Sequence, residues 1–252
     1  MPRKDEMNHD SYLSYSHEVS SWLHSGRKQL ISKIMNWHLE PSRKPYEILE
    51  VGAGVGQNIE ALKSFGEVDV IEIDPVGLSS LKAIKEIRSV FDQGITSAPV
   101  GQYDVIVACD VIEHLKDDFG AVKWIFDHLR VGGLFIATVP AFQWLFNDHD
   151  RALGHFRRYE QQSFDRLLPQ NCVKLSGGYF NSYLFPVAVI SRIAYQTRRS
   201  IRGISVMEKQ KVPTNRFIEP VLRWVFHRDI ATLNPNSSRL AGLSYFACAR
   251  KL

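Results

Sequence analysis

Short apolar runs alternate with stretches of helical periodicity along the first 140 residues. The runs with the length and apolar content of buried strands are 46–51, 68–73, 103–110 and 134–140. A first helix is predicted after residue 51, and a second passes through Leu78, Leu81, Ile84 and Ile87. A third covers 119–130, and Gly132 and Gly133 are expected to stop it. Strands that alternate with helices predict a parallel sheet covered by helices on both faces.

The flanking regions predict further elements around this sheet. These are one or two helices before residue 40, a short helix over 163–168, a strand with a turn over 172–180, helices over 187–198 and 217–229, and a last strand over 243–250. Neither an internal repeat nor a shift in composition marks a second domain, so we expect residues 1–252 to form one domain.

The overall composition is ordinary, but the charge is unevenly distributed. The chain has 44% hydrophobic and 23% charged residues, as soluble globular proteins do. Residues 186–252 hold 12 Lys and Arg against 3 Asp and Glu, a net charge of +9. The apolar stretch 183–193 followed by the cationic stretch 197–203 would suit weak contact with a membrane surface. The alternative is an ordinary cap helix with a solvated basic end.

Cysteine usage and apolar run length point to a cytoplasmic protein. Cys109, Cys172 and Cys248 lie far apart and form no C-x-x-C pair, which fits a reducing compartment. The N-terminal residues lack the apolar core of a signal peptide. The longest apolar run, 183–190, is far short of the roughly 20 residues of a membrane span. The sequence does not specify an oligomeric state.

A glycine-rich turn follows the first predicted strand. It reads Gly52-Ala53-Gly54-Val55-Gly56, and Glu50 precedes it. Glycines allow a ligand to approach the backbone closely, and the next helix presents free N–H groups. A dinucleotide fingerprint requires a third glycine where this chain has Gln57. An acid at the turn is suited to a cationic amino group, which a pyrophosphate ligand lacks.

A second acid occupies the end of the next predicted strand. Glu72 lies 20 residues after Gly52, a position from which a carboxylate accepts hydrogen bonds from both ribose hydroxyls. The alternative is a solvent-facing acid, and Asp74 is the second candidate for the ribose.

Four ordered segments of the chain resemble one enzyme family. ILEVGAGVGQN, VIEIDP and YDVIVACDVIEHLKDD resemble successive motifs of class I S-adenosylmethionine-dependent methyltransferases. The third is similar to the DVLEH signature of the small-molecule branch that includes the ubiquinone-pathway enzymes. LRVGGLFIATVP resembles the LkPGG segment, with Val131 in place of the usual proline. The resemblance implies a Rossmann-like α/β fold with a mainly parallel seven-stranded sheet, and S-adenosyl-L-methionine as cofactor.

The resemblance also implies roles for individual residues. Glu50 and the turn Gly52, Ala53, Gly54 and Gly56 would hold the methionine part of the cofactor. Glu72 would hold the ribose, Ile73 would pack on the adenine, and Asp92 would reach the adenine amino group, although the loop after Asp92 departs from the family's glycine-aspartate pair. Asp110 and Val111 would line the methyl-transfer site. The domain would then comprise a helical lid (1–44), a cofactor-binding core (45–180), a helical insertion or cap (181–240) and the last strand (241–252).

Two more segments resemble a bacterial subset of this superfamily. Residues 141–158 are similar to its HD…GHxRRY segment, and WLHSGRKQLI (22–31) is similar to its N-terminal motif. That subset often belongs to polysaccharide, glycolipid or secondary-metabolite pathways. Trp22 and Arg27 would fold over the cofactor as part of the lid and contact the acceptor.

The segment HDRALGHFRRYE, residues 149–160, follows the strand predicted at 134–140 and so begins at the carboxyl edge of the sheet. We expect it to face the acceptor, with His149 or His155 as base. Asp150, Arg157, Arg158 and Tyr159 would bind the acceptor, since arginine binds carboxylate and phosphate bidentately. His114 is a further candidate base. The alternative is a helix-start loop held by Asp–Arg pairs.

Two other ligands of this segment are disfavoured. The acids beside the arginines would repel phosphate, so no nucleic acid is expected. His149, Asp150 and His155 are possible metal ligands, but no further cysteine or acid cluster completes a coordination shell and methyl transfer in the family needs no metal. We therefore expect no metal.

Together these features predict a methyltransferase acting on a small-molecule, saccharide or lipid-linked acceptor, at oxygen because candidate bases are present. One alternative is N-methylation of an amine or amino sugar. Others are a non-catalytic cofactor-binding module and a nicotinamide-dependent oxidoreductase, which Gln57 disfavours.

Overall fold

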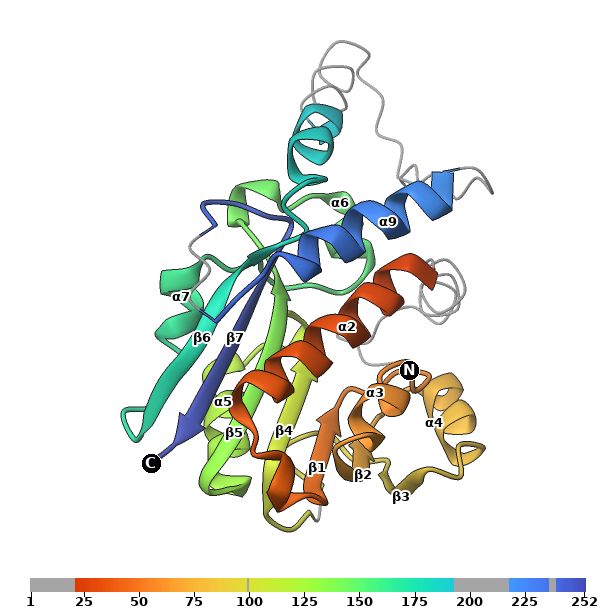
Figure 1. Ribbon diagram of the computed structural model, residues 1–252, viewed down its shortest axis with the longest axis vertical. Coiled ribbons are helices and arrows are strands. Elements are labelled where there is room, and N and C mark those ends of the chain that lie inside the picture. Colours follow the sequence, from red (N-terminus) through yellow and green to blue (C-terminus); the bar gives the residue numbers. More distant parts are fainter. Residues whose placement is uncertain (1–20, 99, 193–217, 236–238) are drawn as a thin grey trace.

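The computed structural model describes residues 21–98, 100–192, 218–235 and 239–252. Within these ranges seven strands form one sheet in the order β3-β2-β1-β4-β5-β7-β6 (Figure 1). They are β1 (Tyr46–Val51), β2 (Gly66–Ile71), β3 (Ile87–Phe91), β4 (Tyr103–Cys109), β5 (Leu129–Pro140), β6 (Cys172–Phe180) and β7 (Ser244–Lys251). Strands β1 to β5 are parallel, and β7 runs antiparallel between β5 and β6. The predicted mainly parallel, seven-stranded sheet is confirmed.

Helices cover both faces of the sheet. The described α-helices are α2 (Ser21–His38), α3 (Ile59–Lys63), α4 (Pro75–Lys82), α5 (Asp118–His128), α6 (Asp148–Ala152), α7 (Gln161–Asp165) and α9 (Ile218–Ala231), and residues 185–192 are also helical. The described part of the chain also has three short 3-10 helices, η1 (Pro41–Arg43), η2 (Ile112–His114) and η3 (Gln143–Leu145). One apolar core joins α2 and α9 to the sheet, and a second lies under α5. None of the described helices is long and apolar enough to cross a bilayer.

Strand β3 is absent from the prediction, which placed Ile87 in a helix. Helix α4 ends at Lys82, and Ile87 instead begins β3 and pairs with Val68. The edge strand is only partly buried, so it lacks the continuous apolar run that marks β1 and β4.

Three predicted boundaries are also wrong. Strand β2 ends at Ile71, so Glu72 follows the strand instead of ending it. Helix α5 ends at His128, and β5 begins at Leu129. Gly132 and Gly133 therefore lie inside β5, where the pairing with β4 shifts register between Tyr103 and Val105, and they do not stop a helix.

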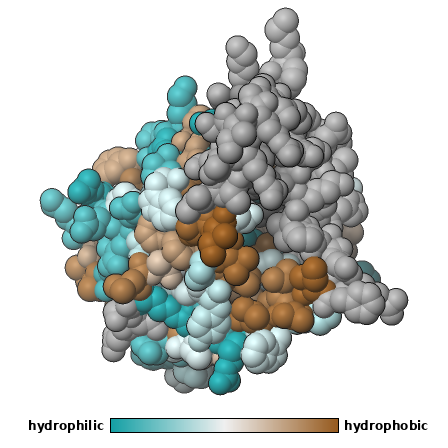
Figure 2. Space-filling view, turned by 90° about the horizontal axis from the view of Figure 1, so that it is seen from above, coloured by the Kyte–Doolittle hydropathy of each residue, from teal (hydrophilic) through white to brown (hydrophobic). Residues whose placement is uncertain are grey.

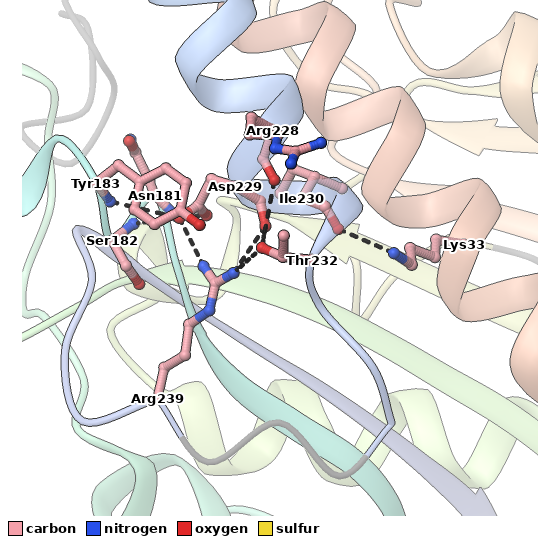
Figure 3. A network of polar contacts seen from close by, with 9 residues as sticks. All are labelled: Lys33, Asn181, Ser182, Tyr183, Arg228, Asp229, Ile230, Thr232 and Arg239. Atoms are coloured by element: carbon pink, nitrogen blue, oxygen red, sulfur yellow. Dashed lines mark hydrogen bonds and ion pairs between the residues drawn. The ribbon is translucent and has the colours of Figure 1, made fainter.

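A buried carboxylate fixes α9 against the end of β6 (Figure 3). Asp229 is fully buried and accepts hydrogen bonds from the backbone N–H groups of Asn181 and Ser182, at 2.7 and 3.1 Å. Arg239 forms an ion pair with the same carboxylate at 2.5 Å. Lys33 of α2 donates to the carbonyl of Ile230 at 3.1 Å. The Asp229 contacts tie α9 to the end of β6, and the Lys33 contact joins α2 to α9.

Hydrophobic side chains also remain on the surface. Figure 2 views the molecule from above the orientation of Figure 1 and shows brown hydrophobic areas among teal ones. Exposed large apolar residues of the described chain include Trp144, Tyr183, Val187, Ile190, Val221 and Trp224.

Candidate active site

The glycine turn after β1 adopts a backbone that side chains rarely allow. Gly52, Gly54 and Gly56 have φ values of 65°, 58° and 88°, in the left-handed region. A Cβ atom on Gly52 would lie 2.5 Å from Cγ2 of Val111, the residue that follows Asp110 beyond β4. The turn therefore needs glycine both for its conformation and for the close approach of β1 to the end of β4.

Glu50 lies buried near the end of β1 with half of its carboxylate unsatisfied. Oε1 accepts a hydrogen bond from Nδ2 of Asn58 at 2.7 Å, whereas Oε2 has no partner in the described residues. Burial raises the pKa of Glu50 to about 7. A cationic amino group beside Oε2 would pair the carboxylate, so this residue fits the role expected from the sequence.

Glu72 braces the glycine turn from the end of β2. Its Oε2 accepts from the backbone N–H of Gly54 at 2.6 Å, and its Oε1 accepts from those of Ile73 and Asp74, each at 2.8 Å. Burial raises the pKa of Glu72. Asp74, the second candidate for the ribose, instead caps α4 by accepting from the N–H of Val76 at 2.8 Å.

Two candidate adenine contacts lie next to Glu72. Ile73 is 58% exposed, unusual for an isoleucine directly after a buried strand. The backbone N–H of Glu72 donates to the carbonyl of Phe91 at 3.0 Å, which brings the exposed Asp92 beside this corner of the sheet. An exposed apolar side chain next to an exposed acid fits a planar ring with an amino group.

Asp110 connects the end of β4 to the helix α2. It has a φ of 55°, and its Oδ1 accepts from the hydroxyl of Thr138 at 3.0 Å. Arg27 forms an ion pair with the other carboxylate oxygen, and both side chains are largely buried. Of the two residues expected in the lid, Arg27 therefore reaches the carboxyl edge of the sheet.

Trp22 has a different environment. It is 4% exposed and packs edge-on against Phe226 of α9, with ring centroids 5.5 Å apart. This places Trp22 in the apolar core between α2 and α9, and its contact with an acceptor stays a prediction.

Within the HDRALGHFRRYE segment, Asp150 is fully buried and accepts several hydrogen bonds. His155 Nδ1 lies 3.1 Å from Asp150 Oδ1, and the Nε and Nη2 atoms of Arg158 lie 2.8 and 2.7 Å from the same oxygen. The backbone N–H of Asn147 donates to Oδ2 at 2.9 Å. These donors hold the pKa of Asp150 well below its usual range.

The other basic and aromatic residues of the segment also have partners within the protein. Arg157 pairs with Asp118 at 2.5 Å, and the buried Tyr159 donates to the same carboxylate at 2.8 Å. Arg151 pairs with Asp148 at 2.8 Å. Asp–Arg pairs thus organise the segment, as expected for the alternative of a helix-start loop held by such pairs. Acceptor binding by Asp150, Arg157, Arg158 and Tyr159 stays a prediction.

The three candidate histidines are not equivalent. His149 is exposed on α6. The rings of His114 and His155 meet edge-on, with centroids 4.5 Å apart. Burial and the neighbouring His155 lower the pKa of His114 to about 3. Both rings are therefore close enough to act on one group, while His149 lies at the surface.

Glu113 completes a cluster that sequence reasoning missed. One ligand atom from each of Glu113, His114 and His155 lies within 4.8 Å of the others. Glu113 is fully buried, and burial raises its pKa well above the usual value. The backbone N–H of Phe156 donates to the Glu113 carbonyl at 2.8 Å, which joins the segment to η2. The Glu-His pair within DVIEH was the available signal.

Comparisons with known proteins identify the family and agree with the fold. The profile of a family described as a methyltransferase domain matches residues 22–202. No curated protein matches the chain. The plantazolicin methyltransferase BpumL in complex with SAH is 11% identical with a TM-score of 0.59, over 96% of this chain and 89% of that chain. The N-methyltransferase NodS from Bradyrhizobium japonicum WM9, in complex with S-adenosyl-L-homocysteine, is 18% identical with a TM-score of 0.50, over 67% and 89%.

The match to the family covers most of the chain, and the turn, Glu50 and Glu72 fit the expected cofactor. The chain therefore belongs to the methyltransferase-domain family and is a class I methyltransferase that uses S-adenosyl-L-methionine.

Proposed function

We propose that the enzyme methylates a hydroxyl group of a small-molecule acceptor. The observation that carries this proposal is the cluster of Glu113, His114 and His155, which begins three residues after Asp110 at the carboxyl edge of the sheet. A hydroxyl must lose its proton as it attacks a methyl group, whereas a neutral amine needs mainly alignment and desolvation. A buried acid with two imidazoles supplies groups that an O-methyltransferase needs.

Each cofactor contact is assigned to a residue at or near the carboxyl ends of β1 to β4. Glu50 Oε2 receives the amino group of the methionine part, and the Gly52–Gly56 turn contacts its backbone. Glu72 holds the ribose, while Ile73 and Asp92 contact the adenine. Asp110 and Val111 lie beside the transferred methyl. When bound, the cofactor supplies an electrophilic methyl group.

His155 is the proposed base. The contact of its Nδ1 with Asp150 orients the ring and leaves Nε2 to receive the hydroxyl proton. Nε2 of His155 would take the proton of the hydroxyl as the hydroxyl oxygen bonds to the methyl carbon supplied by the cofactor and the bond from that carbon to sulfur breaks. His114 is neutral near pH 7 because its pKa is about 3, so it does not repel the protonated ring of His155.

Aromatic side chains near the ends of β5 and β6 support an acceptor with a ring or another apolar part. Phe142 stacks on Tyr179, with centroids 4.8 Å apart, and Trp144 lies next to Phe142 and Phe185. Trp144 is 56% exposed. Such a surface suits a saccharide ring or the apolar part of a lipid-linked acceptor.

Further parts of the proposal concern the setting of the enzyme. Three free cysteines support a cytoplasmic location. We also propose weak membrane contact through the basic stretch 197–203. That stretch lies outside the described residues, as does the part of the predicted helix 187–198 beyond residue 192. Membership of the bacterial HD…GHxRRY subset rests on the segment's sequence.

A paired-substrate assay tests the position of methylation. Purified enzyme is incubated with isotopically labelled S-adenosylmethionine and with aromatic or saccharide acceptors, each in a hydroxyl form and a matched amine form. Mass spectrometry is expected to find the label on oxygen, with turnover dependent on His155. Methylation of the amines alone, unchanged in His155→Ala, would favour the N-methyltransferase alternative. Cofactor binding without turnover of any acceptor would favour the non-catalytic one.

A further inference from the structure

The carboxylate of Glu113 is buried without a partner from another residue. Its side chain is 0% exposed, and neither oxygen receives a hydrogen bond from another residue of the described chain. An uncompensated carboxylate in a protein interior costs several kcal/mol, so buried acids are paired, protonated or bound to a metal. The surroundings of Glu113 decide among these three states.

Each histidine beside Glu113 is oriented by a hydrogen-bonding partner of its own. His155 Nδ1 contacts the buried Asp150, and the backbone of Gly154 hydrogen-bonds the ring of His114. Each ring thus has one nitrogen held, and its other nitrogen is the candidate ligand atom. Metal-binding histidines in proteins are held in this way, with the far nitrogen bonded to a carboxylate or a carbonyl.

We propose that Glu113, His114 and His155 bind one divalent transition-metal cation such as Zn²⁺. Their ligand atoms lie within 4.8 Å of one another, a separation that small side-chain rotations would convert to ligand distances of about 2.0–2.2 Å. Two imidazoles and one carboxylate are donors that favour such a cation over Mg²⁺ or Ca²⁺, which prefer all-oxygen sites. The cation would also compensate the charge of Glu113.

These ligands differ from the ones considered from the sequence, for which we expected no metal. The earlier candidates were His149, Asp150 and His155. Asp150 instead lies behind His155 and is occupied by Arg158, and His149 is on the surface. The missing ligands come from η2, where Glu113 and His114 are adjacent in sequence.

Three protein ligands leave a coordination position open, which is typical of catalytic metal sites. We assign this open position to the acceptor oxygen, an assignment that rests on the proposed O-methylation. The cation would lower the pKa of the bound hydroxyl, whose proton then passes to solvent water. The oxygen bonds to the methyl carbon as the carbon–sulfur bond breaks. With the cation bound, His155 would activate the hydroxyl as a ligand of that cation, and transfer of the proton to Nε2 would apply to the enzyme without the cation.

Cobalt(II) alone is the probe for the site, because its visible absorption reports coordination geometry. Chelator-treated full-length enzyme is titrated with Co²⁺ and followed by calorimetry and absorption. The expected result is one site per chain, with the intense visible bands of low coordination number. Glu113→Gln and His155→Ala are expected to abolish these bands, and Asp150→Asn to weaken affinity about 10- to 100-fold.

Two matched controls separate this site from surface histidines. His149→Ala removes the exposed histidine of the same segment, and His128→Gln removes one on α5 whose Nδ1 contacts the Trp124 carbonyl at 2.8 Å. Both are expected to leave the bands unchanged. Absent bands in the wild type, or bands unchanged in folded Glu113→Gln and His155→Ala, would overturn the proposal.

Separate measurements report whether each variant is folded, whether the cation site is present and whether the enzyme methylates hydroxyl groups. Binding of S-adenosylhomocysteine and circular dichroism report whether each variant is folded. If a ligand variant does not fold, His114→Gln replaces it in the same titration. Hydroxyl methylation at full rate in excess chelator, with no Co²⁺ site, would overturn the cation alone. A Co²⁺ site in an enzyme that methylates only amines would overturn the proposed O-methylation alone.

Discussion

Nδ1 of His155 lies 3.1 Å from Oδ1 of Asp150, and both side chains come from the segment that follows β5. Arg158 binds the same carboxylate oxygen, so one fully buried acid holds an imidazole and a guanidinium in place. Because His155 also meets His114 of η2 edge-on, Asp150 orients the imidazole that contacts η2.

Asp150→Asn is expected to destabilise the fold strongly. It would leave the buried guanidinium of Arg158 without its counter-charge, and breaking a buried pair costs about 3–5 kcal/mol. The matched control is Asp148→Asn, because Asp148 pairs with the exposed Arg151 on the same helix and such pairs contribute about 0–1 kcal/mol. Urea unfolding measures both, and equal losses of unfolding free energy would contradict the buried role of Asp150.

Glu72→Gln is expected to lower affinity for S-adenosylhomocysteine about 10- to 150-fold. A hydrogen bond to a charged group contributes about 1.5–3 kcal/mol, and Glu72 also braces Gly54. Asp74→Asn is the control, because asparagine caps a helix as aspartate does. Calorimetry measures both affinities. A larger loss of affinity in Asp74→Asn than in Glu72→Gln would assign the ribose contact to Asp74 instead of Glu72.

Cofactor affinity is expected to fall with decreasing pH below about 7. Burial raises the pKa of Glu50 to about 7, so its carboxyl becomes neutral below that pH and loses its attraction for the cofactor's amino group. Linkage then predicts a loss of up to about tenfold per pH unit as pH falls. Glu50→Gln should bind more weakly at pH 8 and show a flat profile between pH 5.5 and 8. A wild-type profile that is flat over this range would refute the assignment of Glu50.

The ends of β1 and β4 were predictable to within one residue because each of these short apolar runs stops sharply. Glu50 was placed near the end of β1, and Asp110 follows Cys109, the last residue of β4. The edge strand β3 was not predictable, because Ile87 and Val90 are only partly buried and the strand lacks a continuous apolar run. Partial burial weakens the hydrophobic signal from which strands are predicted.

Partners within the HDRALGHFRRYE segment were not predictable, because pairing depends on the path of the backbone. The sequence shows three arginines near several acids, and the structure gives each arginine a different carboxylate. Glu113 was missed for the same reason, since His155 lies 42 positions away in sequence. Long-range contacts of this kind have no local periodicity.

We expect the hydroxyl of the acceptor to be activated at His155, and the rate of single-turnover methyl transfer to a hydroxylated acceptor reports this activation. His155→Ala is expected to lower the rate at least about 100-fold, while His149→Ala changes it by less than about twofold. Both variants should bind S-adenosylhomocysteine as the wild type does. Full turnover in His155→Ala, with cofactor affinity unchanged, would refute this role of His155.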